Sequence, residues 1–184
     1  MPNEIDLRYP IGKVKDQLFS DKGSNDERAK AAHILDIQQC PNLLEAAISN
    51  LDEHQLNVPY REGGWTSKQV IHHVADSHMN AFIRFKLGLT EDNPAIRPYM
   101  EAAWAELPDT KNCPINISLT LLHSLHLRLY ELLKNLSEAD WNKTIFHPQQ
   151  ERTMTLWNLL EIYSWHGRHH VAHITSLRDR MNWR

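Results

Sequence analysis

The chain has 184 residues, of which 41% are hydrophobic and 23% charged, and its formal net charge at pH 7 is -3. This length favours one domain spanning 1–184, and a count of only six glycines favours helices over sheets and loops. Basic and acidic residues alternate along the chain, which excludes the basic surface of a protein that binds nucleic acid or an anionic membrane and leaves a small molecule as the expected partner.

Targeting and redox signals are absent from the sequence. The first residues lack the basic and then apolar pattern of a signal peptide, and no apolar run approaches the length of a membrane span. Cys40 and Cys113 are far apart, so they indicate neither a disulfide framework nor a thiolate zinc site. We therefore expect a cytoplasmic protein.

The first half of the chain predicts an arm and two helices. Residues 1–23 should form an irregular N-terminal arm, because Pro10 and Gly12 interrupt it and no helical stripe develops. A helix is expected over about 25–51, with capping side chains at 24–27 and a bend at Pro41. The next should cover about 67–89, since Thr66 and Gln69 have the spacing of a capping box.

The second half predicts two more long helices after a loop. Prolines interrupt the segment that follows residue 92, so it cannot be continuous helix. Helices are expected over about 115–135 and 155–180, with a short turn through Trp141 between them and Thr155 as the cap of the last. Without a convincing strand pair, the pattern predicts an all-α four-helix bundle, and two connections long enough to be crossovers leave its topology open.

Histidine is the unusual component, with 12 residues in all, four of them within 166–173. His166 with His170, and His169 with His173, are each four residues apart, so each pair lies one turn apart on one helix face and could hold a metal ion. The first pair falls within the apolar stripe of its helix. His169 lies about a quarter turn or more outside that stripe and His173 is intermediate, so the first pair is predicted to face the interior.

A third metal ligand can come from the helix over about 67–89, which carries His72, His73 and His78. His72 points away from the apolar side, but spacing does not choose between the other two. A lone buried histidine is more often a hydrogen-bonded core residue, whereas a pair on a buried stripe with another cluster nearby indicates a metal site. Three imidazoles suit Zn²⁺ first and Ni²⁺ second, and they leave a position for water or substrate.

Other polar and aromatic residues have a functional and a structural interpretation. Asp76 could orient a ligand ring or act as a general base, or it could be a solvated helix charge. Glu161 could likewise orient a ligand ring or be a solvated helix charge. Arg97 could bind a substrate anion or be a surface arginine. Tyr163 is interpreted as a core or interface aromatic.

Five segments together resemble the YfiT group of the DinB-like superfamily. They are YPIG (9–12), YREGGWT (60–66), VIHHVADSH (70–78), PAIRPY (94–99) and WHGRHHVAH (165–173). The resemblance covers nearly the whole chain and implies a DinB-like four-helix bundle, usually a homodimer, with one divalent metal ion per chain. It further implies that His73, His166 and His170 bind the ion. Gly167 and Arg168 depart from the residues usual at their positions.

The resemblance also implies a function. The implied function is hydrolysis by a metal-dependent hydrolase, in which a three-histidine metal site activates water. The alternative is a metal-dependent thiol S-transferase that uses a low-molecular-weight thiol such as bacillithiol to detoxify electrophiles. A non-catalytic metal-binding module is the third interpretation, and four protein ligands without a cavity would favour it.

Overall fold

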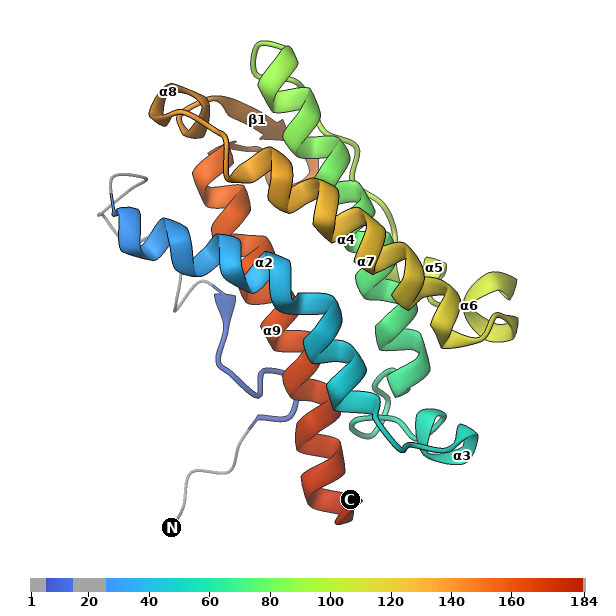
Figure 1. The fold of residues 1–184 in the computed structure, drawn as a ribbon. Helices are drawn as coiled ribbons and strands as arrows, with labels where there is room; N and C mark the ends of the chain where they lie inside the picture. Colours follow the sequence, from blue (N-terminus) through green and yellow to red (C-terminus); the bar gives the residue numbers. More distant parts are fainter. Residues whose placement is uncertain (1–5, 15–25, 184) are drawn as a thin grey trace.

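Four long helices make up the fold in the computed structural model, which describes residues 6–14 and 26–183 (Figure 1). They are α2 (Glu27–Ile48), α4 (Ser67–Thr90), α7 (Ile115–Leu133) and α9 (Leu156–Met181). Short elements connect them: α3 (Glu53–Leu56), α5 (Glu101–Trp104), α6 (Pro108–Asn112), α8 (Glu138–Trp141), β1 (Thr144–His147), η2 (Pro148–Gln150) and β2 (Arg152–Thr155). The expected four-helix bundle is confirmed. No helix in the described ranges has the length and apolar character needed to cross a bilayer.

The bundle has a crossed connectivity. Helix α2 packs against α7 and α9, and α4 packs against the same two helices, so the order round the bundle is α2, α7, α4, α9. In Figure 1, α2 and α9 run in one direction and α4 and α7 in the other. Both the α2-to-α4 and the α7-to-α9 connections therefore join helices that are diagonal to each other. Neighbouring α4 and α7 are parallel, so the segment between them, which carries α5 and α6, returns along the bundle.

Side-chain caps fix where three of the long helices, α2, α4 and α9, begin. Asp26 accepts hydrogen bonds from the first turn of α2. Thr66 and Gln69 form the expected capping box at the start of α4, and Thr155 caps α9 in the same way together with Asn158. These residues satisfy N–H groups that have no partner inside a helix, which explains why the sequence located the starts of the helices within two residues.

A small hairpin corrects the expectation that the chain has no strand pair. Strands β1 and β2 are antiparallel, with Thr144 opposite Thr155 and His147 opposite Arg152. Glu151, in the turn, has a left-handed φ of 48°. Each strand has only four residues, which is too short for alternation to stand out from the surrounding sequence. The hairpin matters for the site because it places His147 beside a cavity.

The N-terminal arm is described only in part, because residues 1–5 and 15–25, including part of the expected cap region, lie outside the described residues. Within 6–14 the backbone turns twice, with the Tyr9 N–H donating to Asp6 and the Gly12 N–H to Tyr9. A φ of 82° at Gly12 explains why glycine occurs there. The ring of Tyr9 lies 6.1 Å from that of His169, so this part of the arm reaches α9.

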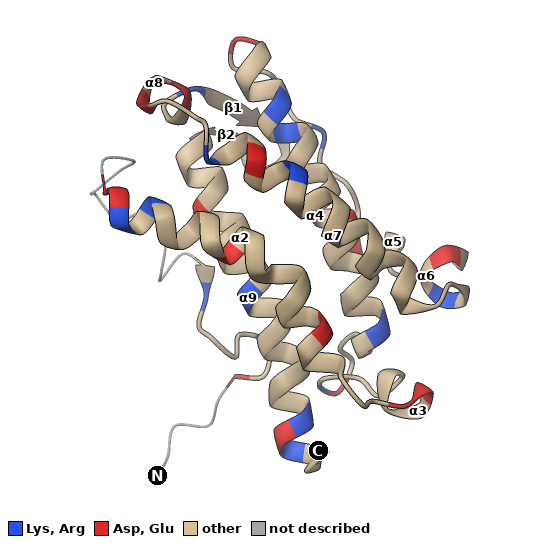
Figure 2. Ribbon diagram, viewed as in Figure 1, with Lys and Arg blue, Asp and Glu red and all other residues tan. Residues whose placement is uncertain are grey.

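The surface charge agrees with the alternation seen in the sequence. Figure 2 shows basic and acidic residues on the same elements, for example on α3 with its flanks, on α6 and near the end of α9. Ion pairs join several neighbours, such as Lys111 with Glu106 at 2.9 Å and Lys30 with Glu27 at 2.7 Å. Residues of both signs thus lie close together on these elements of the described chain.

The interior is divided into two apolar clusters by a layer of histidines. One cluster lies toward the hairpin and contains Phe85, Leu129, Trp141 and Tyr163 among others; the second contains Leu44, Val74, Leu122 and Ile174 among others. Between them along α4, α7 and α9 lie four buried or half-buried histidines: His78, His126, His166 and His170. A polar layer in this position requires hydrogen-bond partners, because unpaired polar groups are costly in an apolar interior.

Helices α2 and α9 approach each other closely at Gly167, which lies in this layer. A Cβ at position 167 would lie 2.9 Å from Sγ of Cys40, nearer than ordinary contact allows. We expect Gly167→Ala to lower the free energy of unfolding by about 1–2 kcal/mol, since overpacking outweighs the gain of about 1 kcal/mol in helix propensity. Cys40→Ala removes the clash, so in that background the same change should raise it. Urea unfolding of the wild type, the two single variants and the double variant measures both values, and equal effects in the two backgrounds would contradict the packing argument.

Candidate metal centre

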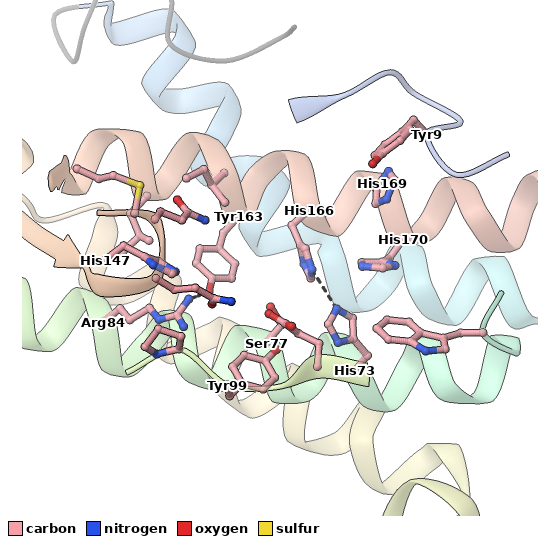
Figure 3. Close-up of a pocket in the computed structure, with 18 residues that line it drawn as sticks. Tyr9, His73, Ser77, Arg84, Tyr99, His147, Tyr163, His166, His169 and His170 are labelled. Atoms are coloured by element: carbon pink, nitrogen blue, oxygen red, sulfur yellow. Dashed lines mark hydrogen bonds between the residues drawn. The ribbon is translucent and has the colours of Figure 1, made fainter. Parts of the chain in front are cut away.

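A cavity of about 600 Å³ lies beside the histidine layer (Figure 3). Helices α4 and α9 supply half of its described lining, and the N-terminal arm, Trp65, the segment 98–101 and the hairpin supply the rest. In Figure 3, His73, His166 and His170 lie toward one end, and Arg84 and His147 lie toward the other. A volume of this size falls within the range of about 300–1,000 Å³ that is usual for small-molecule sites.

Three of the predicted site residues meet at one end of this cavity. His73 comes from α4, and His166 and His170 come from α9, one turn apart. One ring nitrogen from each lies within 4.8 Å of those of the other two. The Nε2 atoms of His73 and His166 are 3.3 Å apart. The structure thus brings together the three residues that the resemblance implied.

This arrangement fits a divalent metal ion. Two nitrogens that each lie about 2.0–2.1 Å from a tetrahedral ion are separated by roughly 3.3 Å, which matches the distance between the Nε2 atoms of His73 and His166. Burial lowers the pKa of His73 to about 4, and it lowers the pKa values of His166 and His170 well below 6.5. All three rings are therefore neutral near pH 7, and the neutral imidazole is the form that binds metal ions.

The other histidines of α4 do not line the cavity. Nδ1 of His72 lies 2.7 Å from the hydroxyl of Ser118 on α7, in agreement with the prediction that His72 points away. His78 approaches His166 from behind, with its Nε2 atom 3.1 Å from Nδ1 of His166. His73 and His78 thus contact the same ring from opposite sides, which explains why helical spacing could not choose between them.

His169 differs from the expectation based on periodicity. It lies outside the apolar stripe of α9, yet its side chain is only 7% exposed and lines the cavity. The physical reason is that the arm covers this face of the helix, with Tyr9 near His169, while the Trp165 ring stacks on His169 at 4.2 Å. A helical wheel contains no information about a covering segment from elsewhere in the chain. His169 lines the cavity but is not part of the group of three converging nitrogens.

Asp76 is half-buried on α4 and is not among the described residues that line the cavity. Burial raises its pKa to about 6, and the negative charge of Asp109 contributes to this rise. The one carboxylate in the described lining is that of Glu101. Burial raises the pKa values of Tyr99 and Tyr163 and lowers that of His147, and the negative charge of Glu101 makes a smaller upward contribution to all three. The role of Asp76 stays a prediction.

The far end of the cavity contains residues that the sequence did not single out for function. Arg84, rather than Arg97, is the arginine in the described lining, and its Nη1 donates to the Tyr163 hydroxyl at 2.9 Å. Burial raises the pKa of Tyr163, so this hydroxyl stays protonated. Arg84 lies eleven residues after His73, close to three helical turns, and this spacing was the available signal. His147 depends on the hairpin and carried no such signal.

Comparisons with known proteins agree with the fold. The family model of the DinB superfamily matches residues 36–174. A Bacillus mycoides (strain KBAB4) protein with the name "Putative metal-dependent hydrolase" is 53% identical over 178 residues, which cover 97% of this chain and 99% of the relative. A protein of the same name from Bacillus cereus (strain 03BB102) has the same identity and coverage.

A solved structure is also similar. YfiT from Bacillus subtilis superimposes with a TM-score of 0.91 and 44% sequence identity, covering 98% of this chain and 100% of that one. It is described as "a probable metal-dependent hydrolase with an unusual four-helix bundle topology". The chain described here likewise forms a four-helix bundle, and its connectivity is crossed.

The three converging histidines lead to a prediction about metal content. The purified protein should contain about one divalent ion per chain, and His73→Ala, His166→Ala and His170→Ala should each abolish tight binding, because three ligands make one site. His169→Ala is the matched control, since this residue lines the same cavity on the same helix, and it should leave the ion in place. Metal analysis of the four variants measures this. An empty site in His169→Ala with a full site in His166→Ala would refute the assignment.

The buried imidazoles also make stability depend on pH. Burial holds the pKa at about 4 for His73, His126 and His173 and at about 3 for His169, against about 6.5 in an unfolded chain. Between these values the unfolded state binds more protons, so the metal-free protein should lose stability progressively as the pH falls from about 6.5 to 4. Asp76, with its raised pKa, acts in the opposite direction but is a single group. Urea unfolding at pH 8, 6 and 5 measures the slope, which His126→Gln should reduce; a flat profile would be inconsistent with neutral buried rings.

Proposed function

The chain belongs to the DinB superfamily, and on that premise we propose that it is a metal-dependent hydrolase acting on a small molecule. The observation that carries the proposal is the convergence of three buried or half-buried imidazoles, those of His73, His166 and His170, at one end of a cavity. Three protein ligands leave coordination positions for water or substrate, as in catalytic rather than structural sites. Zn²⁺ is the ion we expect first, and Ni²⁺ second, because both accept neutral imidazole.

When bound, a divalent ion at this position supplies Lewis acidity, which lowers the pKa of water or of a thiol toward neutrality. The chain's own side chains would position the substrate. Arg84 is held by two contacts, to the Tyr163 hydroxyl at 2.9 Å and to the Arg97 carbonyl at 3.3 Å. A fixed guanidinium in a cavity suits a substrate that carries a carboxylate or phosphate group at the end remote from the histidines.

Hydrolysis also requires a group that removes a proton from water. We assign this role to Glu101 rather than to Asp76, because Glu101 is the one carboxylate in the described lining of the cavity. Trp65 would restrict the entry of bulk water beside the ligands, since its ring lies 4.6 Å from that of His73. Both contributions come from segments outside the four long helices.

A thiol S-transferase that uses a low-molecular-weight thiol is the second candidate. The size of the cavity favours it, since about 600 Å³ can hold both a small thiol and its electrophile. This reaction asks less of the protein, because a thiolate needs no further base once it has formed. A non-catalytic metal module is less consistent with a cavity at a three-ligand site. The homodimer expected from the resemblance stays a prediction, which sedimentation at tens of micromolar would test.

The base assignment predicts a contrast between two conservative variants. Glu101→Gln should lower kcat for hydrolysis by about 10²-fold or more, the usual contribution of a general base, and should leave metal content unchanged. Asp76→Asn, which removes a half-buried carboxylate from a neighbouring position of the fold, should retain activity within a few-fold. Steady-state assays with small ester substrates that carry an anionic group measure both. The reverse order of effects would return the role to Asp76.

The reaction class can be tested on one sample. Chelation should abolish ester hydrolysis while the far-ultraviolet circular dichroism stays largely helical, because the two apolar clusters hold the bundle on either side of the site. Readdition of Zn²⁺ should restore hydrolysis. Conjugation of a small thiol to an electrophile, with no hydrolysis in the same zinc-loaded sample, would replace the hydrolase by the transferase. Loss of helicity on chelation would indicate a structural site instead.

A further inference from the structure

A row of buried imidazoles continues from His166 away from the cavity. Nδ1 of His166 lies 3.1 Å from Nε2 of His78, and Nδ1 of His78 lies 2.9 Å from Nε2 of His126. The row ends on α2, where Nδ1 of His126 is within hydrogen-bond distance of the backbone carbonyl oxygen of Ile37. The row thus crosses the bundle from α9 through α4 and α7 to α2, and His78 is fully buried within it.

The carbonyl at the end of the row fixes its direction. A carbonyl oxygen can only accept, so the N–H of His126 must be on Nδ1. Burial lowers the pKa of His126 to about 4, which makes the ring neutral, and a neutral imidazole has one donor and one acceptor. Its Nε2 atom therefore accepts from Nδ1–H of His78, and Nε2 of His78 accepts from Nδ1–H of His166. The remaining nitrogen of His166, Nε2, is left with its lone pair toward His73.

A second, shorter row stands behind His170. Its Nδ1 atom lies 3.3 Å from Nδ1 of His173, and Nε2 of His173 lies 3.2 Å from the carbonyl oxygen of Arg8 in the N-terminal arm. The same reasoning places the N–H of His173 on Nε2 and the N–H of His170 on Nδ1, so Nε2 of His170 also keeps its lone pair. The Tyr60 ring stacks on His173 at 3.9 Å and holds its orientation.

We propose that two backbone carbonyls, those of Ile37 and Arg8, set the tautomers of two metal ligands through intervening imidazoles. In this arrangement His78, His126 and His173 are positioning residues, which present the Nε2 lone pairs of the ligands to the ion without touching it. Such partners behind a ligand commonly contribute a factor of about 10–100 to metal affinity. The inference rests on the proposed metal site, and it extends that site to the arm and to α2.

A competing interpretation is a second metal site. Cys40, His78 and His126 are buried, and one possible ligand atom from each lies within 4.8 Å of the others. Whichever nitrogen of His78 bound such an ion, the ring could no longer both accept from His166 and donate to His126. The second site would therefore either remove the hydrogen bond that orients His166 or reverse its direction, which would place the N–H of His166 on Nε2. Burial also raises the pKa of the Cys40 thiol to about 12, which disfavours the thiolate that a metal ion requires.

The tautomers can be observed directly. Nitrogen-15 NMR of histidine-labelled protein distinguishes Nδ1–H from Nε2–H in neutral rings, and free histidine favours Nε2–H. We expect Nδ1–H at His78 and His126 in both the metal-free and the zinc-loaded protein, and Nε2–H at His173. Nε2–H at His78 or His126 would overturn the proposal even if the protein binds zinc normally. The expected tautomers in a protein that binds no zinc would instead refute the proposed function and leave the rows intact.

Paired variants separate orientation from packing. Glutamine places an amide oxygen near the position of histidine Nε2, and asparagine places one near Nδ1, so His126→Gln and His173→Asn keep the acceptor of each row. His126→Leu and His173→Leu remove it. Zinc competition titrations should show about 10–100-fold weaker binding in the leucine variants and values within a few-fold of wild type in the amide variants. His72→Leu, a buried histidine of α4 outside both rows, is the matched control and should bind normally.

Two results would overturn the proposal in these titrations. One is equal loss of affinity in the leucine and amide variants, which would indicate packing alone. The other is a second zinc ion per chain that disappears in Cys40→Ser, because that ion would take His78 out of its row. Far-ultraviolet circular dichroism of each variant confirms that the helices are intact, and the NMR measurement on wild type stands even if one variant does not fold.

Discussion

The structure depends on one constraint, that a neutral imidazole buried away from water needs both a donor and an acceptor for its two ring nitrogens. The layer between the two apolar clusters contains such rings on α4, α7 and α9. The rings behind the cavity form rows that end at backbone carbonyls, so each of their ring nitrogens has a hydrogen-bond partner. This arrangement leaves the Nε2 lone pairs of His166 and His170 at the cavity, where His73 or a metal ion is their partner.

The crossed connectivity brings the partners of these imidazoles together from distant parts of the sequence. His73 and His166 lie 93 positions apart in sequence, and they meet because α4 and α9 are neighbours in the bundle. Helix α2 contributes the Ile37 carbonyl, and the N-terminal arm contributes the Arg8 carbonyl. Gly167 lets α2 approach α9 closely enough for Cys40 to pack against the layer. The substrate end of the cavity, by contrast, is built from Arg84 of α4 and from connecting segments, which can vary without disturbing the layer.

The sequence predicted the parts that depend on local chemistry. Helix starts followed from Thr66 and Thr155, and the four-helix bundle followed from the apolar stripes. Periodicity placed His166 and His170 inside, but the choice of His73 came from a family resemblance, since His73 and His78 both contact His166. The hairpin with His147 was missed because its strands are short, and His169 was misjudged because the arm that covers it comes from a distant part of the chain. These are contacts between segments, which no local pattern contains.

The central claim is that Nε2 atoms of His73, His166 and His170 bind one ion while the histidines behind them do not. Anomalous X-ray diffraction from zinc-loaded crystals, measured on both sides of the zinc absorption edge, tests it most directly. We predict a single anomalous peak per chain about 2.0–2.1 Å from these three nitrogens, together with density for a non-protein ligand. A peak among Cys40, His78 and His126, or a peak bound by His169 in place of His166, would contradict the account.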